Sequence, residues 1–252
     1  MGAVFGVYLK YVALSAMSAA GAYGHLNDDF SVSALSAVLL YVALVNGFIS
    51  VLFGAQRGMN LVGKRSDGTI PLWSYVLLSG FHLPTLFYTY VHTMIGKKEG
   101  IPVATEILSG WWLGGRYGNE LGISKWGVVV DLTVEFPEHC MVEDSENYVL
   151  LRCWDGVPPT PEGLEIAAQR CANFLGSPTP SGSTRLPIMI HCAHGRGRST
   201  CTMCAAFVRA GLYDTWQAAF EAIKEKRSCV RLNGKMRRAL TQWTERYCKK
   251  QG

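Results

Sequence analysis

The chain has 252 residues, a net charge of +5 at neutral pH, 49% hydrophobic residues and only 17% charged residues. The charged share is well below the roughly 25% of an average soluble domain, so part of the chain must be unusually apolar. The mild positive charge suits a phosphate-bearing substrate or an anionic membrane surface and is too weak to indicate a nucleic-acid partner. The eight cysteines begin at Cys140 and lack the spacing of a disulfide framework, which favours free thiols in a reducing compartment.

Residues 1–99 contain three apolar runs, at about 4–24, 32–53 and 70–95. A helix of about 20 residues crosses the hydrocarbon core of a bilayer, so these runs predict a membrane-anchoring region of transmembrane helices in an integral membrane protein. The middle run has no charged residue and carries the strongest signal. The first run could instead be a signal peptide, because residues 19–22 are small, but Lys10 interrupts its apolar segment.

Basic residues predict how this region is oriented. The segment at 57–65 is basic and is expected on the cytoplasmic side, and Lys97 and Lys98 after the third run favour the same side. Three full crossings cannot place both basic segments there. The third run is therefore predicted to be re-entrant or interfacial, broken at Pro84, with the rest of the chain facing the cytosol.

From about residue 100, strand-like and helix-like segments alternate, which predicts an α/β domain with a mostly parallel central sheet flanked by helices. Strands are expected at 111–113, 128–132, 148–151 and 188–190, and helices at 162–175, 199–210, 214–226 and 233–248. Thr160 is expected to cap the first of these helices, with Pro161 at its first position. The predicted organisation is a membrane region at 1–99 and an α/β domain at 100–252.

A segment with chemical character joins the last predicted strand to a helix. It reads His191-Cys192-Ala193-His194-Gly195-Arg196-Gly197-Arg198-Ser199. A glycine-containing turn at a helix N-terminus presents backbone N–H groups to an anion, so residues 193–198 (Ala193, His194, Gly195, Arg196, Gly197, Arg198) are predicted to bind phosphate. This setting lowers the pKa of the Cys192 thiol, and Arg198 can grip two oxygens of a tetrahedral oxyanion. A cysteine so placed is suited to attack on phosphorus.

The His-Cys-x-x-Gly-x-x-Arg-Ser pattern resembles the signature of the protein tyrosine phosphatase superfamily, and the remaining spacing is similar to its dual-specificity branch. Segments at 107–115, 129–133 and 226–233 resemble that branch's opening strand, next strand and late helix–loop element. The resemblance covers about 105–248 and leaves residues 1–99 without a counterpart. It implies the cysteine phosphatase fold and phosphomonoester hydrolysis through a phosphocysteine, with no metal or other cofactor.

The resemblance also implies the roles of individual residues. The catalytic set is Cys192, Arg198, Asp155, Ser199 and His191. In this set Ser199 stabilises the departing thiolate, and His191 orients the loop and assists the low thiol pKa. The general acid comes from a mobile loop upstream of the cysteine. Asp155 is preferred over Asp131 there, because Asp131 lies within an apolar strand, where its counterpart in the family is structural.

Several alternatives stay open at this stage. The resemblance favours phosphotyrosine, phosphoserine or phosphothreonine in proteins as substrate, whereas a membrane anchor brings the site close to phosphoinositides or other phospholipids. An inactive phosphate-binding membrane adaptor and sulfur transfer of the rhodanese type are rival classes. His194 and Arg196 are either solvent-facing or extra positive charge for a polyanionic substrate. Cys201 and Cys204 are expected to be packed thiols rather than a redox pair.

Overall fold

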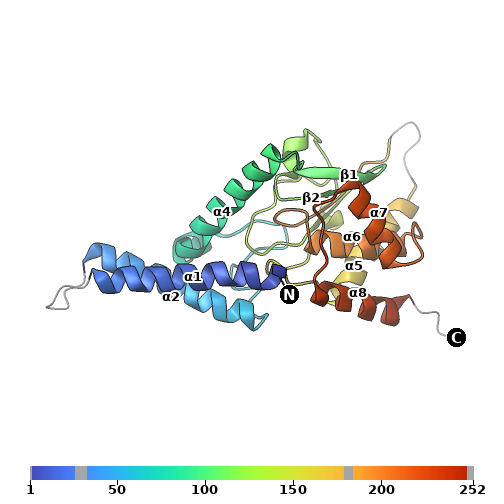
Figure 1. The fold of residues 1–252 in the computed structure, drawn as a ribbon. Helices are drawn as coiled ribbons and strands as arrows, with labels where there is room; N and C mark the ends of the chain where they lie inside the picture. The colour runs from blue at the N-terminus through green and yellow to red at the C-terminus, as the bar shows by residue number, and fades with distance from the viewer. Residues whose placement is uncertain (1, 26–32, 179–183, 249–252) are drawn as a thin grey trace.

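The computed structural model describes residues 2–25, 33–178 and 184–248. Helices occupy the N-terminal part of this chain, and a five-stranded sheet with further helices follows (Figure 1). We refer to the first four helices as the N-terminal helices and to residues 104–247 as the α/β region. The two parts are in contact, and that contact shapes the site described below.

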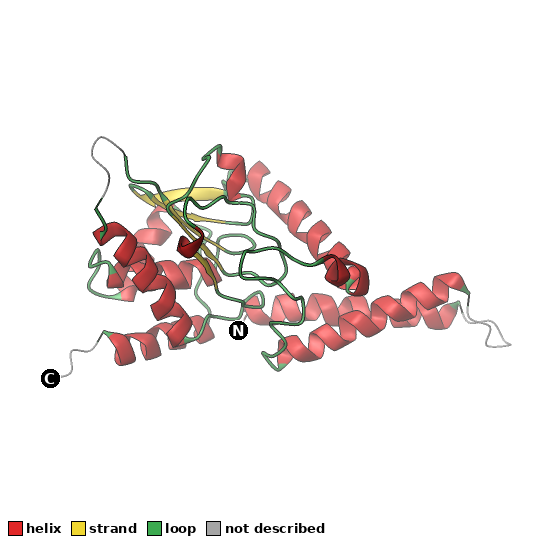
Figure 2. Ribbon diagram, turned by 180° about the vertical axis from the view of Figure 1, so that it is seen from behind, coloured by secondary structure: helices red, strands yellow, loops and turns green. Residues whose placement is uncertain are grey.

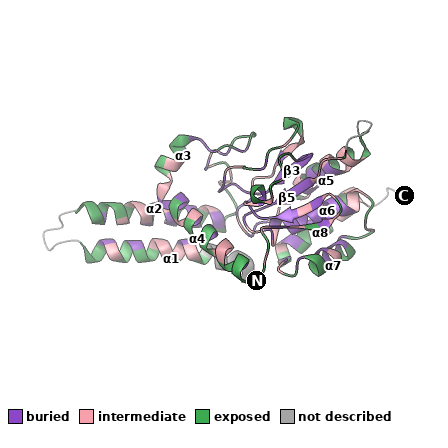
Figure 3. Ribbon diagram, turned by 90° about the horizontal axis from the view of Figure 1, so that it is seen from above, coloured by how far each residue is buried: buried purple, intermediate pink, exposed green. Residues whose placement is uncertain are grey.

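The N-terminal helices are α1 (Gly2–Gly24), α2 (Ala34–Gly54), α3 (Leu72–Leu77) and α4 (Ser79–Lys98). The first two pack side by side as a hairpin that extends away from the sheet (Figure 1). Exposed residues predominate along the far part of this hairpin (Figure 3). On α2 the exposed side chains are large and apolar: Leu35, Val38, Leu40, Leu44, Phe48 and Val51. Such a face is unfavourable in water and suits an apolar environment.

Among the described residues, one helix is long and apolar enough to cross a membrane. It is α2, whose mean hydropathy is 2.2 and of which 28% is buried within the protein. The helix α4 has sufficient length, but it does not reach this hydropathy, since two histidines and several hydroxyl-bearing residues lie in it even before Lys97. The expected second run is thus an apolar helix, whereas the third run lacks the composition of a full crossing.

The predicted break at Pro84 is wrong. The third run is interrupted at Leu78, and Pro84 lies inside α4. A proline removes the N–H that would bond the carbonyl four residues earlier, which is that of Gly80. Here Asn46 of α2 donates to the Gly80 oxygen instead, at 2.8 Å. The helix therefore continues, because a neighbouring side chain satisfies the carbonyl that proline leaves free.

The sheet has the strand order β1-β2-β5-β3-β4. Its strands are β1 (Ala104–Leu108), β2 (Trp111–Gly114), β3 (Val128–Asp131), β4 (Tyr148–Leu150) and β5 (Ile188–His191). All neighbours are parallel except β1 and β2, which confirms the mostly parallel sheet. The segment 107–115 is not a single strand, because the chain turns at Gly110, whose φ of 78° is favourable only for glycine.

Four helices cover one face of this sheet (Figure 2). They are α5 (Pro161–Gly176), α6 (Arg198–Arg209), α7 (Trp216–Lys226) and α8 (Gly234–Tyr247), as the sequence predicted within two residues at each end. Thr160 caps α5 through a hydrogen bond from the Gly163 N–H (3.1 Å), with Pro161 at the first helical position. The opposite face carries a smaller core around Trp126, Val129 and Met189. The parallel strands β5 and β3 end together at His191 and Asp131, where the site forms.

Candidate active site

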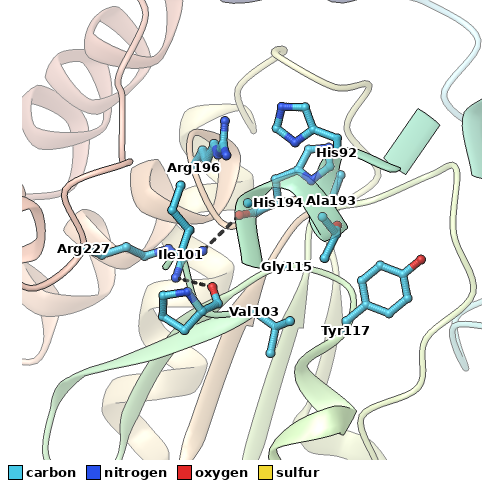
Figure 4. A pocket seen from close by; sticks show the side chains of 12 residues that line it. His92, Ile101, Val103, Gly115, Tyr117, Ala193, His194, Arg196 and Arg227 are labelled. Carbon is cyan, nitrogen blue, oxygen red and sulfur yellow. Dashed lines mark hydrogen bonds between the residues drawn. The ribbon is translucent and has the colours of Figure 1, made fainter. Parts of the chain in front are cut away.

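Hydrogen-bond donors outside the loop after β5 hold the conformation of this loop. The Ala193 carbonyl accepts from the Arg116 N–H (3.2 Å), and the Arg196 carbonyl accepts from the Arg231 N–H (2.7 Å). Between them, Arg227 donates to the carbonyls of His194 (3.2 Å) and Gly195 (2.9 Å), as Figure 4 shows in part. Because C=O and N–H point in opposite directions across a trans peptide, these bonds turn the loop N–H groups inward. This loop conformation is compatible with the anion nest that the sequence predicts, which stays a prediction.

Cys192 lies at the base of this nest and is 3% exposed. Its Sγ lies 3.3 Å from the hydroxyl of Ser199 in the first turn of α6. Burial alone raises the pKa of the Cys192 thiol, but the Arg198 charge and the hydrogen bonds from Ser199 outweigh it, and the net pKa lies below its usual range. Burial raises the thiol pKa of Cys171 to about 12, and it raises that of Cys153 to about 12 as well, because there the Arg198 charge does not outweigh burial. The thiolate is therefore selectively stabilised at Cys192.

Arg198 is fully buried and held in place on several sides. Its Nη1 donates to the carbonyls of Leu132 (2.8 Å) and Cys153 (2.6 Å), and its Nη2 donates to the carboxylate of Glu135 (2.8 Å). Its Nε is buried without a hydrogen-bond partner among the described residues. A buried N–H without an acceptor is costly, so this donor is available to an acceptor that binds beside it. Glu135 was not predicted, because only the fold brings it to Arg198.

Asp155 reaches the same place from a different loop. Its Oδ1 lies 3.2 Å from Arg198 Nη2, and its side chain is 28% exposed to the pocket. Burial raises the pKa of the Asp155 carboxyl, but the charges of Arg198 and Lys10 outweigh it and hold the pKa below its usual range. An anion bound to Arg198 would weaken this stabilisation and add negative charge, and both effects raise the pKa of Asp155. The structure thus brings Asp155 together with Cys192 and Arg198.

Asp131, the competing aspartate, lies outside the pocket in a buried ionic network. Its carboxylate is paired with Lys64, which comes from the segment between α2 and α3. It also accepts from the Tyr148 hydroxyl (2.9 Å) and from the Thr133 N–H and hydroxyl (both 2.8 Å). Burial raises the pKa of Asp131, and the charges of Lys64 and His191 more than reverse this, to about 2. These contacts hold the Asp131 carboxyl in its ionised form, and Asp131 does not line the pocket that contains Cys192.

His191 borders this network and immediately precedes the nucleophile. Its Nε2 lies 2.6 Å from Glu138 Oε2 and 4.0 Å from Asp131 Oδ1. Burial alone lowers the pKa of the imidazole, but the charges of Glu138 and Asp131 raise it to about 9. These three side chains could surround a cation by distance alone. The positive charges of His191 and of Lys64 already lie among these carboxylates, so the arrangement is a closed ionic network.

The pocket above Cys192 has a volume of about 370 Å³. Its lining includes Asp155, Cys192, His194, Arg196, Gly197 and Arg198 from the predicted set, together with Gly156, Arg231, Asn233 and Met236. Tyr88 and His92 of α4 form the remaining wall. The His92 ring lies 4.4 Å from the ring of His194, centroid to centroid. No sequence pattern predicts a helix of the apolar region beside the loop, and His92 was expected to be packed or interfacial.

The comparisons with known proteins concern the fold. No family model matches the chain, and no curated protein matches its sequence. Human DUSP28 aligns with a TM-score of 0.44 and 16% identity, over 59% of this chain and 97% of its own. PTPMT1 in complex with PI(5)P gives 0.44 and 16%, over 57% and 96%. The human tyrosine phosphatase-like serine/threonine/tyrosine-interacting protein gives 0.43 and 17%, over 58% and 98%. Each match spans nearly all of the solved chain and somewhat more than half of this one.

Proposed function

We propose that this protein is a cysteine-dependent phosphatase that hydrolyses phosphomonoesters through a phosphocysteine intermediate. One observation carries the proposal. Cys192 with a lowered thiol pKa, Arg198 with a buried Nε that has no partner in the part of the chain that the structure describes, and Asp155 meet in a single pocket, although Asp155 lies on a separate loop. A thiolate beside an anion nest and a carboxyl group is the arrangement that nucleophilic attack on a phosphate requires.

The first step transfers the phosphoryl group to sulfur. The Cys192 thiolate attacks phosphorus, and the bond between phosphorus and the leaving oxygen breaks. Asp155 in its protonated form gives its proton to that oxygen, so the product leaves as an alcohol or phenol. The loop N–H groups and Arg198 stabilise the charge that develops on the three equatorial oxygens. Asp155 ends this step as a carboxylate.

The second step returns the enzyme to its starting state. The Asp155 carboxylate takes a proton from a water molecule, whose oxygen attacks phosphorus as the P–S bond breaks. Inorganic phosphate is released, and Asp155 is again protonated. The sulfur departs as a thiolate, which the Ser199 hydroxyl stabilises from 3.3 Å. His191 keeps its ionic contacts with Glu138 throughout and supports the start of the loop.

The substrate class that we propose first is the phosphoprotein, with phosphotyrosine, phosphoserine or phosphothreonine, in keeping with the resemblance in the loop sequence. A second candidate is a membrane phosphoinositide or phospholipid. It is favoured by the outer face of α4, where Leu83, Phe87, Val91 and Ile95 are exposed at four-residue spacing on the helix that also walls the pocket. We further propose residues 1–99 as a membrane anchor and residues 100–252 as a phosphatase domain that faces the cytosol.

The test uses the full chain in lipid nanodiscs. Turnover is measured on an aryl phosphate, on phosphotyrosine and phosphoserine peptides, and on phosphoinositide vesicles. We expect Cys192→Ser to abolish turnover and Asp155→Asn to lower kcat by about 10²–10⁴-fold on alkyl phosphates. The matched control is Cys248→Ser, which removes a thiol at the end of α8, away from the pocket.

The outcomes separate the candidate functions. Faster turnover of peptides than of vesicles supports the protein phosphatase, and the reverse supports the lipid phosphatase. Turnover that persists in Cys192→Ser would exclude the phosphocysteine route. A folded wild-type chain that binds phosphate but turns over none of these substrates would point to the inactive membrane adaptor.

A further inference from the structure

Trp154, the residue before the proposed general acid, packs into a site on the N-terminal part of the chain. We call this site, formed by Phe53, Phe81 and the Arg57 carbonyl, the seat of Trp154. Its side chain is almost fully buried, with 1% exposed. The indole packs against Phe53 of α2 at 5.7 Å and edge-on against Phe81 of α4 at 6.0 Å, between ring centroids. Its Nε1–H donates to the carbonyl of Arg57 at 2.8 Å. All three contacts come from residues that precede the α/β region.

The seat of Trp154 is part of a larger apolar cluster. Tyr11 of α1 touches both Phe53 and Phe81, and its hydroxyl bonds Thr85 of α4 at 3.1 Å. The cluster comprises Tyr11, Ile49, Phe53, Val62, Ile70 and Phe81 from the N-terminal part and Val134, Trp154 and Val157 from the α/β region. Aromatic rings in such a cluster bury large areas and have few alternative packings, so the seat is well defined.

The other side of the same loop faces the chemistry. Asp155 Oδ1 lies 3.2 Å from Arg198, and the Gly156 carbonyl accepts from the Asn233 side chain at 2.9 Å. Gly156 has a φ of 78°, so the chain turns sharply directly after the acid. The position of the Asp155 carboxyl is therefore set between two anchors, the indole on the helices and the Gly156–Asn233 bond at the pocket.

We propose that the N-terminal helices position the general acid, and that Trp154 is the positioning residue through which they do so. The inference rests on the proposed function of Asp155. It assigns the helices a role in the reaction besides any anchoring, because the seat formed by Phe53, Phe81 and the Arg57 carbonyl determines where the acid loop lies. An acid misplaced by about 1 Å loses much of its effect on proton transfer.

Two variants of the full chain in nanodiscs test this. Trp154→Phe keeps an aromatic ring but removes the N–H that bonds Arg57, and Phe53→Leu loosens the seat without altering the loop. Turnover is compared on an aryl phosphate with an acidic phenol and on a phosphoserine peptide. The phenol departs without a proton, whereas the serine oxygen requires one, so a positioning role predicts a selective loss. We expect kcat/KM, which reports only the transfer of the phosphoryl group to sulfur, to fall about tenfold or more on phosphoserine and less than about threefold on the aryl phosphate.

The control is Phe48→Leu, which changes an exposed phenylalanine on α2, the helix that also carries Phe53. It is expected to leave the rates on the phosphoserine peptide and on the aryl phosphate unchanged. In an Asp155→Asn background, Trp154→Phe should cause no further selective loss, because the acid through which it acts is gone. Equal losses on both substrates, or a full additional loss in that background, would show that Trp154 is merely structural and would overturn the proposal.

Amide hydrogen exchange of segment 153–157 tests the positioning of the loop without relying on turnover, so it can fail or succeed independently of the proposed function. We expect protected amides in the wild type, faster exchange in Trp154→Phe and Phe53→Leu, and no change in Phe48→Leu. If the wild type shows no turnover, the phosphatase proposal fails, and exchange still decides whether the helices hold the loop. Exchange in segment 153–157 that is the same in Phe53→Leu as in the wild type would overturn the seat itself.

Discussion

At the scale of single residues, the balance between burial and charge gives one buried cysteine a lower thiol pKa than its neighbours. Cys192 and Cys201 are both buried and are close in sequence, yet the pKa of Cys201 is raised well above its ordinary value by burial, whereas that of Cys192 is lowered. The difference lies in Arg198 and in the hydroxyl of Ser199 at 3.3 Å. A hydrogen bond to a charged group contributes about 1.5–3 kcal/mol, which makes the Ser199 contact testable.

Ser199→Ala removes the hydroxyl that stabilises the Cys192 thiolate. Since this hydrogen bond lowers the thiol pKa, its loss raises the pKa, and the rising acid limb of kcat/KM against pH should move to higher pH. The kcat value should fall about tenfold or more, because the same hydroxyl stabilises the sulfur that departs in the second step. The measurement is a pH–rate profile on an aryl phosphate.

The matched control for this experiment is Thr202→Val, which removes a hydroxyl one turn along α6 that bonds the Arg198 carbonyl rather than the sulfur. Its acid limb should coincide with that of the wild type. An unchanged limb in Ser199→Ala would contradict the assigned effect of Ser199 on the Cys192 pKa.

At the scale of elements, the loop after β5 depends on close backbone packing against β2. Gly195 has a φ of 66°, and a Cβ at this position would lie 2.5 Å from the carbonyl carbon of Gly114. Both facts require glycine at position 195. Any other L-residue would be strained at this positive φ, and the Gly114 backbone could shift away from a Cβ only at a cost in free energy. Arg227 holds the loop from its other side, through the carbonyls of His194 and Gly195. The loop is thus packed against β2 on one side and hydrogen-bonded to Arg227 on the other.

Gly195→Ala is therefore expected to displace the loop and lower kcat/KM at least 100-fold. Unfolding should become easier by about 1–3 kcal/mol, the usual range for a residue held in a sparsely populated conformation. Gly176→Ala at the end of α5 is the control, because a Cβ there meets nothing within 4 Å. It should leave activity unchanged, and denaturant unfolding with parallel rate measurements checks both variants. Wild-type activity in Gly195→Ala would show that the loop tolerates a Cβ.

At the scale of the whole molecule, the N-terminal part completes the core of the α/β region. The Lys64 side chain is fully buried and is paired with Asp131 at the end of β3. Its ammonium group also donates to the carbonyl (3.1 Å) and hydroxyl (3.0 Å) of Thr133. Its own carbonyl accepts from Arg152, at 2.9 Å from Nη2. The segment between α2 and α3 is therefore built into the domain that carries the site, on the side of His191.

Lys64→Met should destabilise the protein by about 3–5 kcal/mol, because it leaves the Asp131 charge buried and unpaired. Adding Asp131→Asn should recover part of this loss, since the double variant has no uncompensated charge. The exposed pair of Lys97 and Glu120 supplies the control, and Lys97→Met should cost at most about 1 kcal/mol. Denaturant unfolding of the full chain measures the stability of all three variants. Equal losses of stability in Lys64→Met and Lys97→Met would contradict the importance of the buried pair.

Local patterns were sufficient to predict much of the fold and to single out Cys192 as the candidate nucleophile. Alternating apolar segments, the Thr160–Pro161 helix start and the glycine-containing turn after β5 act over a few residues, so they are readable from sequence. Cys192 and Arg198 belong to that turn and are brought together by it alone. Asp155 could be predicted only with help from the resemblance, because nothing local links it to the turn. The expected break at Pro84 failed, since a side chain from another helix satisfies the Gly80 carbonyl.

The apolar N-terminal part, the α/β region and the cysteine–arginine loop between strand and helix can all be predicted from sequence patterns. The three-dimensional fold was needed to show that Glu135 holds Arg198, that Lys64 neutralises Asp131, that Tyr88 and His92 line the pocket, and that Trp154 packs against α2 and α4. The physical reason is the range of the interactions. Helix, strand and turn preferences act between neighbours in the chain, whereas buried charges and aromatic rings take their partners from wherever packing brings them.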